Sequence, residues 1–464
     1  MGNKATRRQL LALLTGTIGT VLLGRCRSPE AVSGVEAPSA PQDLTPSAYL
    51  PVISGDTDAP AEPTAVPTTE EPPEPSPVPT TEEPPEPTAG PPPQAGRVVH
   101  VHDADATDWD GSGWYGDAVN QAAVDGMVEV GLQTLTGHSS WTDIWHSLFE
   151  RAQPDGYQPG QKIAIKVNLN NSEYPNGGCT GTGNAIDALP HPVKALVRGL
   201  VAAGVGQGDI WIYDATGQHA PGRIIPNRFR APLIADFPDL QYYGLVESGY
   251  TDACFPGIVP VAFGGNTSLT VGFSDDRITG RTLTSLLAEA TYLINMPILK
   301  RHGIHPVSLG FKNHLGSIDK VNIGADSDQL HLYIDPADAA HYSASYSPLV
   351  DIYKNPNIRD KTILTVGDAL YGAFGATFEP PVTWHTFGDA PNSLLFSTDP
   401  VAIDCVMVDL LAAEGRADRG AYDYLFCAQE AGLGICEGTR ANPGGSPWLT
   451  PYGSGYSAIE YIRL

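Results

Sequence analysis

Apolar residues follow two different periods along the chain from residue 97 onward. Short runs rich in β-branched residues, such as KIAIKV from Lys162, alternate with longer stretches in which apolar positions recur every three or four residues. This alternation is typical of an α/β sheet with crossover helices. The predicted strands are residues 98–102, 162–169, 209–214, 240–246, 291–296, 362–366 and 393–396, and the predicted helices are residues 117–135, 141–152, 192–203, 282–288 and 400–413.

The clearest helix start is the pair Asp399 and Pro400. An aspartate caps free backbone N–H groups, proline fits the first helical position, and VAIDCVMVDLLAA follows at helical spacing. Residues 325–347 and 432–456 are rich in Gly, Pro, Ser, Asp and Tyr and are predicted to be long loops. We therefore predict one α/β domain over residues 97–464, with a mixed, mostly parallel sheet.

The first 96 residues lack both periods. Residues 1–27 have a basic start and an apolar stretch shorter than the roughly 20 residues that span a bilayer, which predicts an export signal. TRRQLL from Thr6 resembles a twin-arginine signal. LGRC, ending at Cys26, resembles a lipoprotein cleavage box except for Arg25, so lipidation, simple cleavage and an uncleaved anchor all stay open. Residues 28–96 contain PTTEEPPEP twice and are predicted to be a disordered tether rich in Pro, Thr and Glu.

Acidic residues outnumber basic residues in both parts of the chain. The formal net charge is −25, and residues 28–96 supply about half of it because they have twelve carboxylates and no Lys or Arg. This balance disfavours nucleic acid and anionic lipid surfaces as partners. Together with the predicted signal in residues 1–27, this balance leads us to expect an exported protein, in the cell envelope or outside the cell, that meets a membrane only through its N-terminal signal or a lipid anchor.

Cysteine spacing bears on cofactors and on redox state. The five cysteines after the signal include no CxxC pair, so neither an iron–sulfur cluster nor a structural zinc site built from them is expected. In an exported protein, Cys427 with Cys436 and Cys179 with Cys254 are candidate disulfides. Cys405 lies in an apolar helical pattern and is predicted to be a buried thiol.

Titratable residues are most concentrated between Tyr292 and Ile318, in YLINMPILKRHGIHPVSLGFKNHLGSI. A predicted strand there places polar residues at or just beyond its carboxyl end, where open α/β sheets bind ligands. Lysines and asparagines in this position suit a carboxylate or phosphate, and a histidine suits proton transfer. The candidates from this segment are Asn295, Lys300, His302, Lys312 and Asn313.

Two other predicted strands end in polar residues. Lys166 and Asn168 lie two apart and share one face of a strand, and Asp214 ends the next strand along the chain. Asp214 and Thr216 would leave the sheet beside Lys166 if the two strands are neighbours. A lysine at a strand end is, however, often simply solvated, and such an aspartate can equally cap a helix.

His191 precedes Pro192 at a predicted helix start. The helix dipole disfavours the protonated form there, which would leave a neutral imidazole suited to base or ligand work, although an exposed capping residue is the common alternative. His302, His305, His314 and His331, with nearby carboxylates, could also hold a metal ion, but no HExxH or other fixed spacing supports that interpretation.

Six motifs occur in an order that resembles the family known as domain of unknown function 362. They are KVNLN from Lys166, HPVKALVRGLVAAGV from His191, LINMPILKRH from Leu293, LGFKNHLGSI from Leu309, TVGDAL from Thr365 and STDPVAIDCVMVDLL from Ser397, within residues 161–415. The resemblance implies an α/β fold with a shared polar site, and it adds Asp368 as a retained acid. Val167 stands where the family has proline. Members are often fused to a ferredoxin-type module, for which this chain has no cysteine run.

The resulting hypothesis is a protein that binds a small anionic molecule and transforms it by Lys/His acid–base chemistry. Lys166, Asn168, Asn295, Lys300, Lys312 and Asn313 would bind it. His302, and after it His191, would transfer protons, while Asp214 or Asp368 would orient an imidazole or a metal. A non-enzymatic solute-binding or surface-displayed module and a histidine-ligated metalloenzyme are the alternatives.

Overall fold

The computed structural model describes residues 96–172, 180, 183–215, 225–244, 257–323, 326–375, 379–417, 420–438, 440 and 455–464. The predicted signal over residues 1–27 with Cys26, the predicted tether up to residue 95, Cys179, Thr216 and Cys254 lie outside these ranges. No helix in the described ranges is long and apolar enough to cross a membrane.

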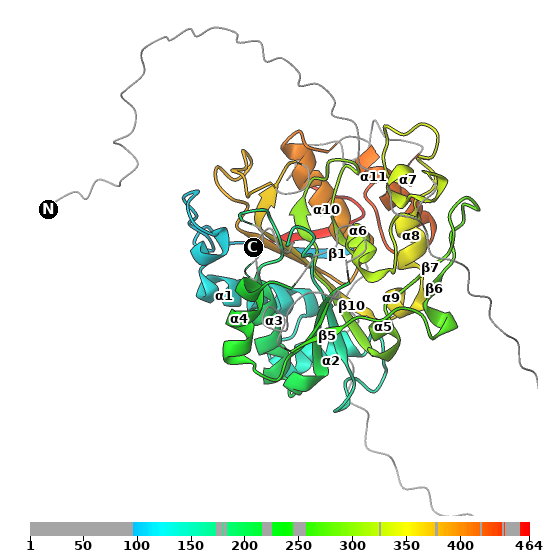
Figure 1. Ribbon diagram of the computed structural model, residues 1–464. Helices are drawn as coiled ribbons and strands as arrows, with labels where there is room; N and C mark the ends of the chain where they lie inside the picture. The colour runs from blue at the N-terminus through cyan, green and yellow to red at the C-terminus, as the bar shows by residue number, and fades with distance from the viewer. Residues whose placement is uncertain are drawn as a thin grey trace, which may run out of the picture. The chain divides into compact units, whose positions relative to one another are not determined.

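A mixed sheet forms the centre of the domain (Figure 1). The strand order is β12–β1–β11–β10–β8–β2–β3–β4–β5, and β9 also pairs with β10. Every pairing in it is parallel except the two that β11 makes, with β1 and with β10. Because β11 is antiparallel to both of its neighbours, β1 and β10, the strand β1 points the same way as β10, β8 and β2. The strands are β1 (Arg97–His102), β2 (Ile163–Lys166), β3 (Ile210–Asp214), β4 (Gln241–Gly244), β5 (Ile258–Pro260), β8 (Tyr292–Asn295), β9 (Ile298–Lys300), β10 (Thr362–Ala373), β11 (Ser393–Ser397) and β12 (Glu460–Arg463).

Helices cover both faces of this sheet, as the α/β prediction requires. Side chains alternate across each strand, so Ile163 and Ile165 of β2 join one core while Ala164 joins the other. The first core is covered by α1 (Gln121–Thr136), α2 (Trp141–Phe149), α3 (Pro190–Ala202) and α4 (Asn227–Asp236). The second is covered by α5 (Leu286–Glu289), α6 (Gly310–Asn313), α7 (Leu330–Tyr333), α8 (Pro348–Tyr353), α10 (Pro400–Ala413) and α11 (Gly420–Glu430).

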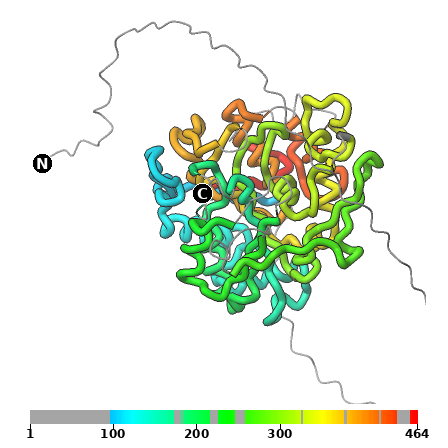
Figure 2. The backbone as a smooth tube through the Cα atoms, viewed as in Figure 1, coloured from blue at the N-terminus to red at the C-terminus, as the bar shows by residue number. Residues whose placement is uncertain are grey.

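The chain changes direction across the sheet at one place. From β2 it proceeds outward through β3, β4 and β5, and then returns to form β8 on the opposite side of β2. The carboxyl ends of β2 and β8 therefore flank the topological switch point, where open α/β sheets bind ligands. At the far end of the sheet, the last strand, β12, lies beside β1 (Figure 2).

Most predicted elements are confirmed, including the helix start at Asp399 and Pro400. The Asp399 side chain accepts hydrogen bonds from the N–H groups of Val401 and Ala402. The predicted helix over residues 282–288 is wrong in its first half, because Arg281–Thr282 forms β7, which pairs with β6 (Thr270–Val271), and α5 begins only at Leu286. Residues 325–347 were predicted as loop, but they include the short helix α7 in their described part.

Two glycines in α1 allow the packing of this helix on the sheet to be tested. A methyl group at Gly131 would lie 2.3 Å from the Phe396 ring of β11, whereas a methyl group at Gly126 would meet nothing within 4 Å. Gly131→Ala should therefore lower the free energy of unfolding by about 1–3 kcal/mol despite the better helix propensity of alanine. Gly126→Ala should raise it by up to about 1 kcal/mol. Urea denaturation measures both, and equal stabilisation by the two substitutions would contradict this packing.

Candidate functional site

The site begins with two paired residues at the switch point. Lys166 ends β2, Asn295 ends β8, and the two are direct partners in the parallel ladder. Strand alternation places both side chains on the face covered by α6 and α10, opposite Ile165 and Ile294. Each side chain is fully buried, with at most 1% of its residue surface exposed, so each needs polar partners.

Lys166 is held by three oxygen acceptors. Its Nζ donates to the Val167 carbonyl at 2.6 Å, to Asp214 Oδ1 at 3.2 Å and to Asn313 Oδ1 at 3.2 Å. Asp214 ends β3, the neighbour of β2, and its second oxygen accepts the Leu169 N–H at 2.7 Å. The predicted proximity of Asp214 and Lys166 is therefore confirmed. Burial lowers the pKa of Lys166 and Asp214 opposes that shift, and the three acceptors together favour the ammonium form.

Asn313 connects this pair to β8. Its Nδ2 donates to Asn295 Oδ1 at 2.8 Å, and Asn295 Nδ2 donates to the Gly310 carbonyl at 3.0 Å. The two amides thus fix the short helix α6 against the end of β8. Since α6 also carries Lys312, this contact sets where the second lysine of the site lies.

A carboxylate of α10 fixes the other side of α6. Asp404 accepts the N–H of Gly310 at 2.8 Å and of Phe311 at 3.1 Å, and the Tyr424 hydroxyl at 2.9 Å. Burial raises the pKa of Asp404 to about 6, although all three donors favour its charged form. Asp404 was not among the predicted site residues. The available signal was a carboxylate within the otherwise apolar pattern VAIDCVMVDLL.

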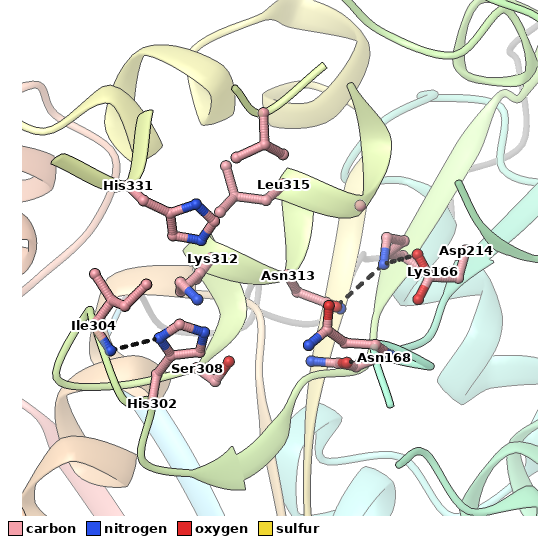
Figure 3. Close-up of a pocket in the computed structure, with 13 residues that line it drawn as sticks. Lys166, Asn168, Asp214, His302, Ile304, Ser308, Lys312, Asn313, Leu315 and His331 are labelled. Carbon is pink, nitrogen blue, oxygen red and sulfur yellow. Dashed lines mark hydrogen bonds and ion pairs between the residues drawn. The ribbon is translucent and has the colours of Figure 1, made fainter. Parts of the chain in front are cut away.

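These contacts enclose a cavity of about 200 Å³ at the switch point (Figure 3). One end has the Lys166, Asp214 and Asn313 group, and the other has Lys312 between two imidazoles. Six of the predicted site residues line it, namely Lys166, Asn168, Asp214, His302, Lys312 and Asn313. The other lining residues are Asn170, Ile304, Ser308, Leu315, Gly316, Val321 and His331.

His302 and His331 lie face to face beside Lys312. Their ring centroids are 5.9 Å apart and the ring planes differ by 10°. Burial, and then the nearby Lys312 ammonium, lowers the pKa of His302, so its imidazole is neutral near pH 7. Its Nδ1 accepts the backbone N–H groups of Ile304 at 3.1 Å and His305 at 3.3 Å. A neutral ring that accepts at Nδ1 has its proton on Nε2, which makes His302 a donor there.

The other predicted site residues lie outside the cavity lining. Asn295 does not line the cavity, but it accepts a hydrogen bond from Asn313, which does. Lys300 is buried on β9, whose pairing with β10 sets it opposite Ala373, and its charge acts on Asp187 and His302. His191 lies in the first turn of α3, and burial lowers its pKa to about 4. Asp368 is buried in β10 opposite Ile298. The structure thus separates Lys300, His191 and Asp368 from the group around Lys166.

The four histidines considered as metal ligands have separate surroundings. His305 Nδ1 lies 2.6 Å from the Val307 carbonyl, and His314 Nδ1 lies 3.3 Å from Ser317 Oγ. Burial lowers the pKa of each of these two to about 3. Only His302 and His331 share the cavity. Across the described ranges, no three His, Cys, Asp or Glu side chains are placed to hold one metal ion.

Comparison with known protein families gives a match over this part of the chain. A family model described as Domain of unknown function (DUF362) matches residues 163–409, more than half of the chain. The matched region runs from the start of β2 to α10, and it includes every residue that lines the cavity. Among curated proteins, none matches the chain.

Asp368 gives a pH prediction that tests its burial. Burial raises the pKa of Asp368 from 3.8 to about 7, so the stabilisation from its protonated form is complete below about pH 4 and is lost as the pH rises to 7. The loss in unfolding free energy should be about 3–4 kcal/mol. Asp368→Asn should remove this part of the pH dependence, measured by urea denaturation from pH 4 to 8.

Other buried carboxyls, including Asp404 and Asp409, have raised pKa values and add slopes of the same sign. The relevant quantity is therefore the difference between wild type and variant. Asp360→Asn, at an exposed position beside Arg359, should leave the pH profile unchanged. A profile for Asp368→Asn that is parallel to wild type would show that Asp368 is ionised in the folded protein.

Proposed function

Because this chain belongs to the family described as Domain of unknown function (DUF362), we propose its function from the cavity itself: it binds a small anionic molecule at the switch point. The observation that carries the proposal is the charge of the cavity lining. The described lining residues include two lysines, Lys166 and Lys312, and one carboxylate, Asp214, which is an excess of basic over acidic side chains. This excess occurs in a chain whose net charge is −25.

The groups around Lys312 support anion binding rather than a general base. His302 presents an Nε2–H donor, and Asn168, Asn170 and Ser308 add amide and hydroxyl groups. Donors of this kind suit carboxylate or phosphate oxygens, and the lower dielectric of a partly enclosed cavity strengthens such hydrogen bonds relative to water. The small cavity volume fits a ligand of metabolite size. Ile304, Leu315 and Val321 would contact an apolar part of that ligand.

A second candidate function is catalysis on the bound anion. A neutral imidazole that donates from Nε2, next to an ammonium group, can stabilise negative charge that develops on an oxygen during proton transfer. His302 and Lys312 supply this pair of groups. In this scheme His302 is an electrophile, which differs from the proton-transfer role expected from the sequence. A solute-binding protein without catalytic activity would use the same cavity residues. The two candidate functions differ only in whether the bound anion is converted to a product.

Removing the Lys312 charge tests the binding proposal. Lys312→Met keeps much of the side-chain volume and should weaken binding of inorganic phosphate or succinate at least about tenfold, because an ion-assisted hydrogen bond is lost. Isothermal titration calorimetry at low ionic strength measures this change. Lys320→Met, at an exposed position in the same segment, is the matched control and should bind as wild type does.

Two outcomes would overturn the proposal. One is a wild-type protein that binds neither anion, and the other is equal affinity in wild type and Lys312→Met. Titrations at pH 6, 7 and 8 with sulfate, whose charge stays constant over this range while that of phosphate changes, test the role of His302. Since its pKa is lowered, affinity should be flat across this range, and tighter binding toward pH 6 would show that an imidazole is gaining a proton.

We also propose that the protein is exported and acts in the cell envelope or outside the cell. The support is the sequence of residues 1–27, with Arg7 and Arg8 in a twin-arginine pattern, and the Pro/Thr/Glu-rich segment that follows. Replacing both arginines by lysine should retain the protein in the cytoplasm of its native host, as measured by cell fractionation. Unchanged export of that variant would contradict a twin-arginine route.

A further inference from the structure

Two buried cysteines meet between α10 and the segment after α11. Cys436 Sγ lies 3.8 Å from Cys405 Sγ, and the two residues are at most 2% exposed. Cys427, the partner expected for Cys436 from the sequence, lies elsewhere. Its sulfur is 3.7 Å from the Ala344 carbonyl and 3.3 Å from Arg440 Nη2. The proximity therefore favours a different pairing from the predicted one.

We propose that Cys405 and Cys436 are a redox-active pair that closes to a disulfide when the protein meets a disulfide oxidant. A disulfide bond is about 2.05 Å long, so the sulfurs must approach by less than about 2 Å, which side-chain rotation can supply. All three described cysteines, Cys405, Cys427 and Cys436, have free thiols in this structure. The proposal rests on this contact alone and is independent of the anion-binding function.

The reaction is thiol–disulfide exchange with a small disulfide, RSSR. The Cys436 thiolate attacks one sulfur of RSSR, forming a mixed disulfide and releasing RS⁻. Cys405, as its thiolate, then attacks Cys436 Sγ, forming the Cys405–Cys436 bond and releasing a second RS⁻. The two protons from the protein thiols pass to these thiolates, giving two RSH, so the protein loses two electrons and RSSR gains them.

The order of attack follows from the surroundings of Cys405. The hydrogen-bonding contact with Cys436 and burial in α10 raise the pKa of Cys405, which makes its thiolate scarce. Cys436, by contrast, lies in an irregular segment that can open more readily than the interior of a helix. Oxidation therefore begins at Cys436, during folding or a local opening of this segment.

The bond would fasten the C-terminal strand to the domain core. Next to Cys436, Ile435 N–H donates to Asp399, the N-cap of α10, at 3.0 Å. On its other side, the Glu437 carboxylate accepts the N–H groups of Ser457, Ala458 and Ile459, just before β12. Linking Cys436 to α10 would thus fix the segment that positions β12 beside β1.

Peptide mapping of the oxidised full-length protein tests the pairing. The protein is equilibrated with oxidised glutathione, alkylated with iodoacetamide under denaturing conditions and digested without reduction. Mass spectrometry should find Cys405 linked to Cys436 and Cys427 alkylated. Oxidation should raise Tm by on the order of 5 °C, because the bond closes a loop in the unfolded chain.

Variants separate this pair from other cysteines. Cys436→Ser should abolish the redox dependence of Tm, and Cys427→Ser, the matched control, should keep it. If Cys436→Ser does not fold, the wild-type peptide map decides alone. Alkylation of both Cys405 and Cys436 after oxidation, or a link from either one to Cys427, Cys179 or Cys254, would overturn the proposal.

Discussion

The parallel pairing of β2 with β8 is the constraint on which the site depends. It brings together two segments more than one hundred residues apart in the sequence, so that Lys166 and Asn295 end side by side. Both are buried polar residues, and leaving either unpaired would cost on the order of 1–3 kcal/mol or more. The Asn313 side chain is hydrogen-bonded to both of them. Because Asn313 and Lys312 both belong to α6, these two hydrogen bonds also fix the position of Lys312.

The second layer of support comes from the helices on one face of the sheet. Asp404 in α10 holds the first turn of α6 through two backbone N–H groups, and Tyr424 of α11 holds Asp404. The cavity thus lies between the carboxyl ends of the central strands and α6, and α6 is itself held in place by Asp404 of α10. For the anion binding proposed above, rigid support of this kind would preorganise the lining groups, because they would lose little freedom when the ligand binds.

Sequence patterns predicted seven of the strands, because each of these contains an apolar run that is recognisable locally. They missed the short strands β5, β6, β7, β9 and β12, and they ended β10 at residue 366 although it continues to Ala373. They also placed Lys166 and Asp214 together, since adjacent parallel strands end at the same edge. They did not separate Lys300 from Lys312. Pro297 interrupts the ladder, and Ile298–Lys300 pairs with β10 instead, a long-range contact that local periodicity does not carry. The role of Asp404 was missed for the same reason, because the backbone N–H groups of α6 that it holds lie more than ninety residues away.

The direction of β1 has a consequence for how the domain can be attached to something else. β1 runs parallel to β2 and β8, so Arg97 begins it at the amino-end edge of the sheet, while the cavity lies beyond the carboxyl ends. Whatever is joined to the domain at Arg97 therefore leaves from the edge opposite the binding cavity. If the domain is tethered and binds an anion as proposed above, attachment and ligand entry would use different surfaces, and the tether would leave the cavity uncovered.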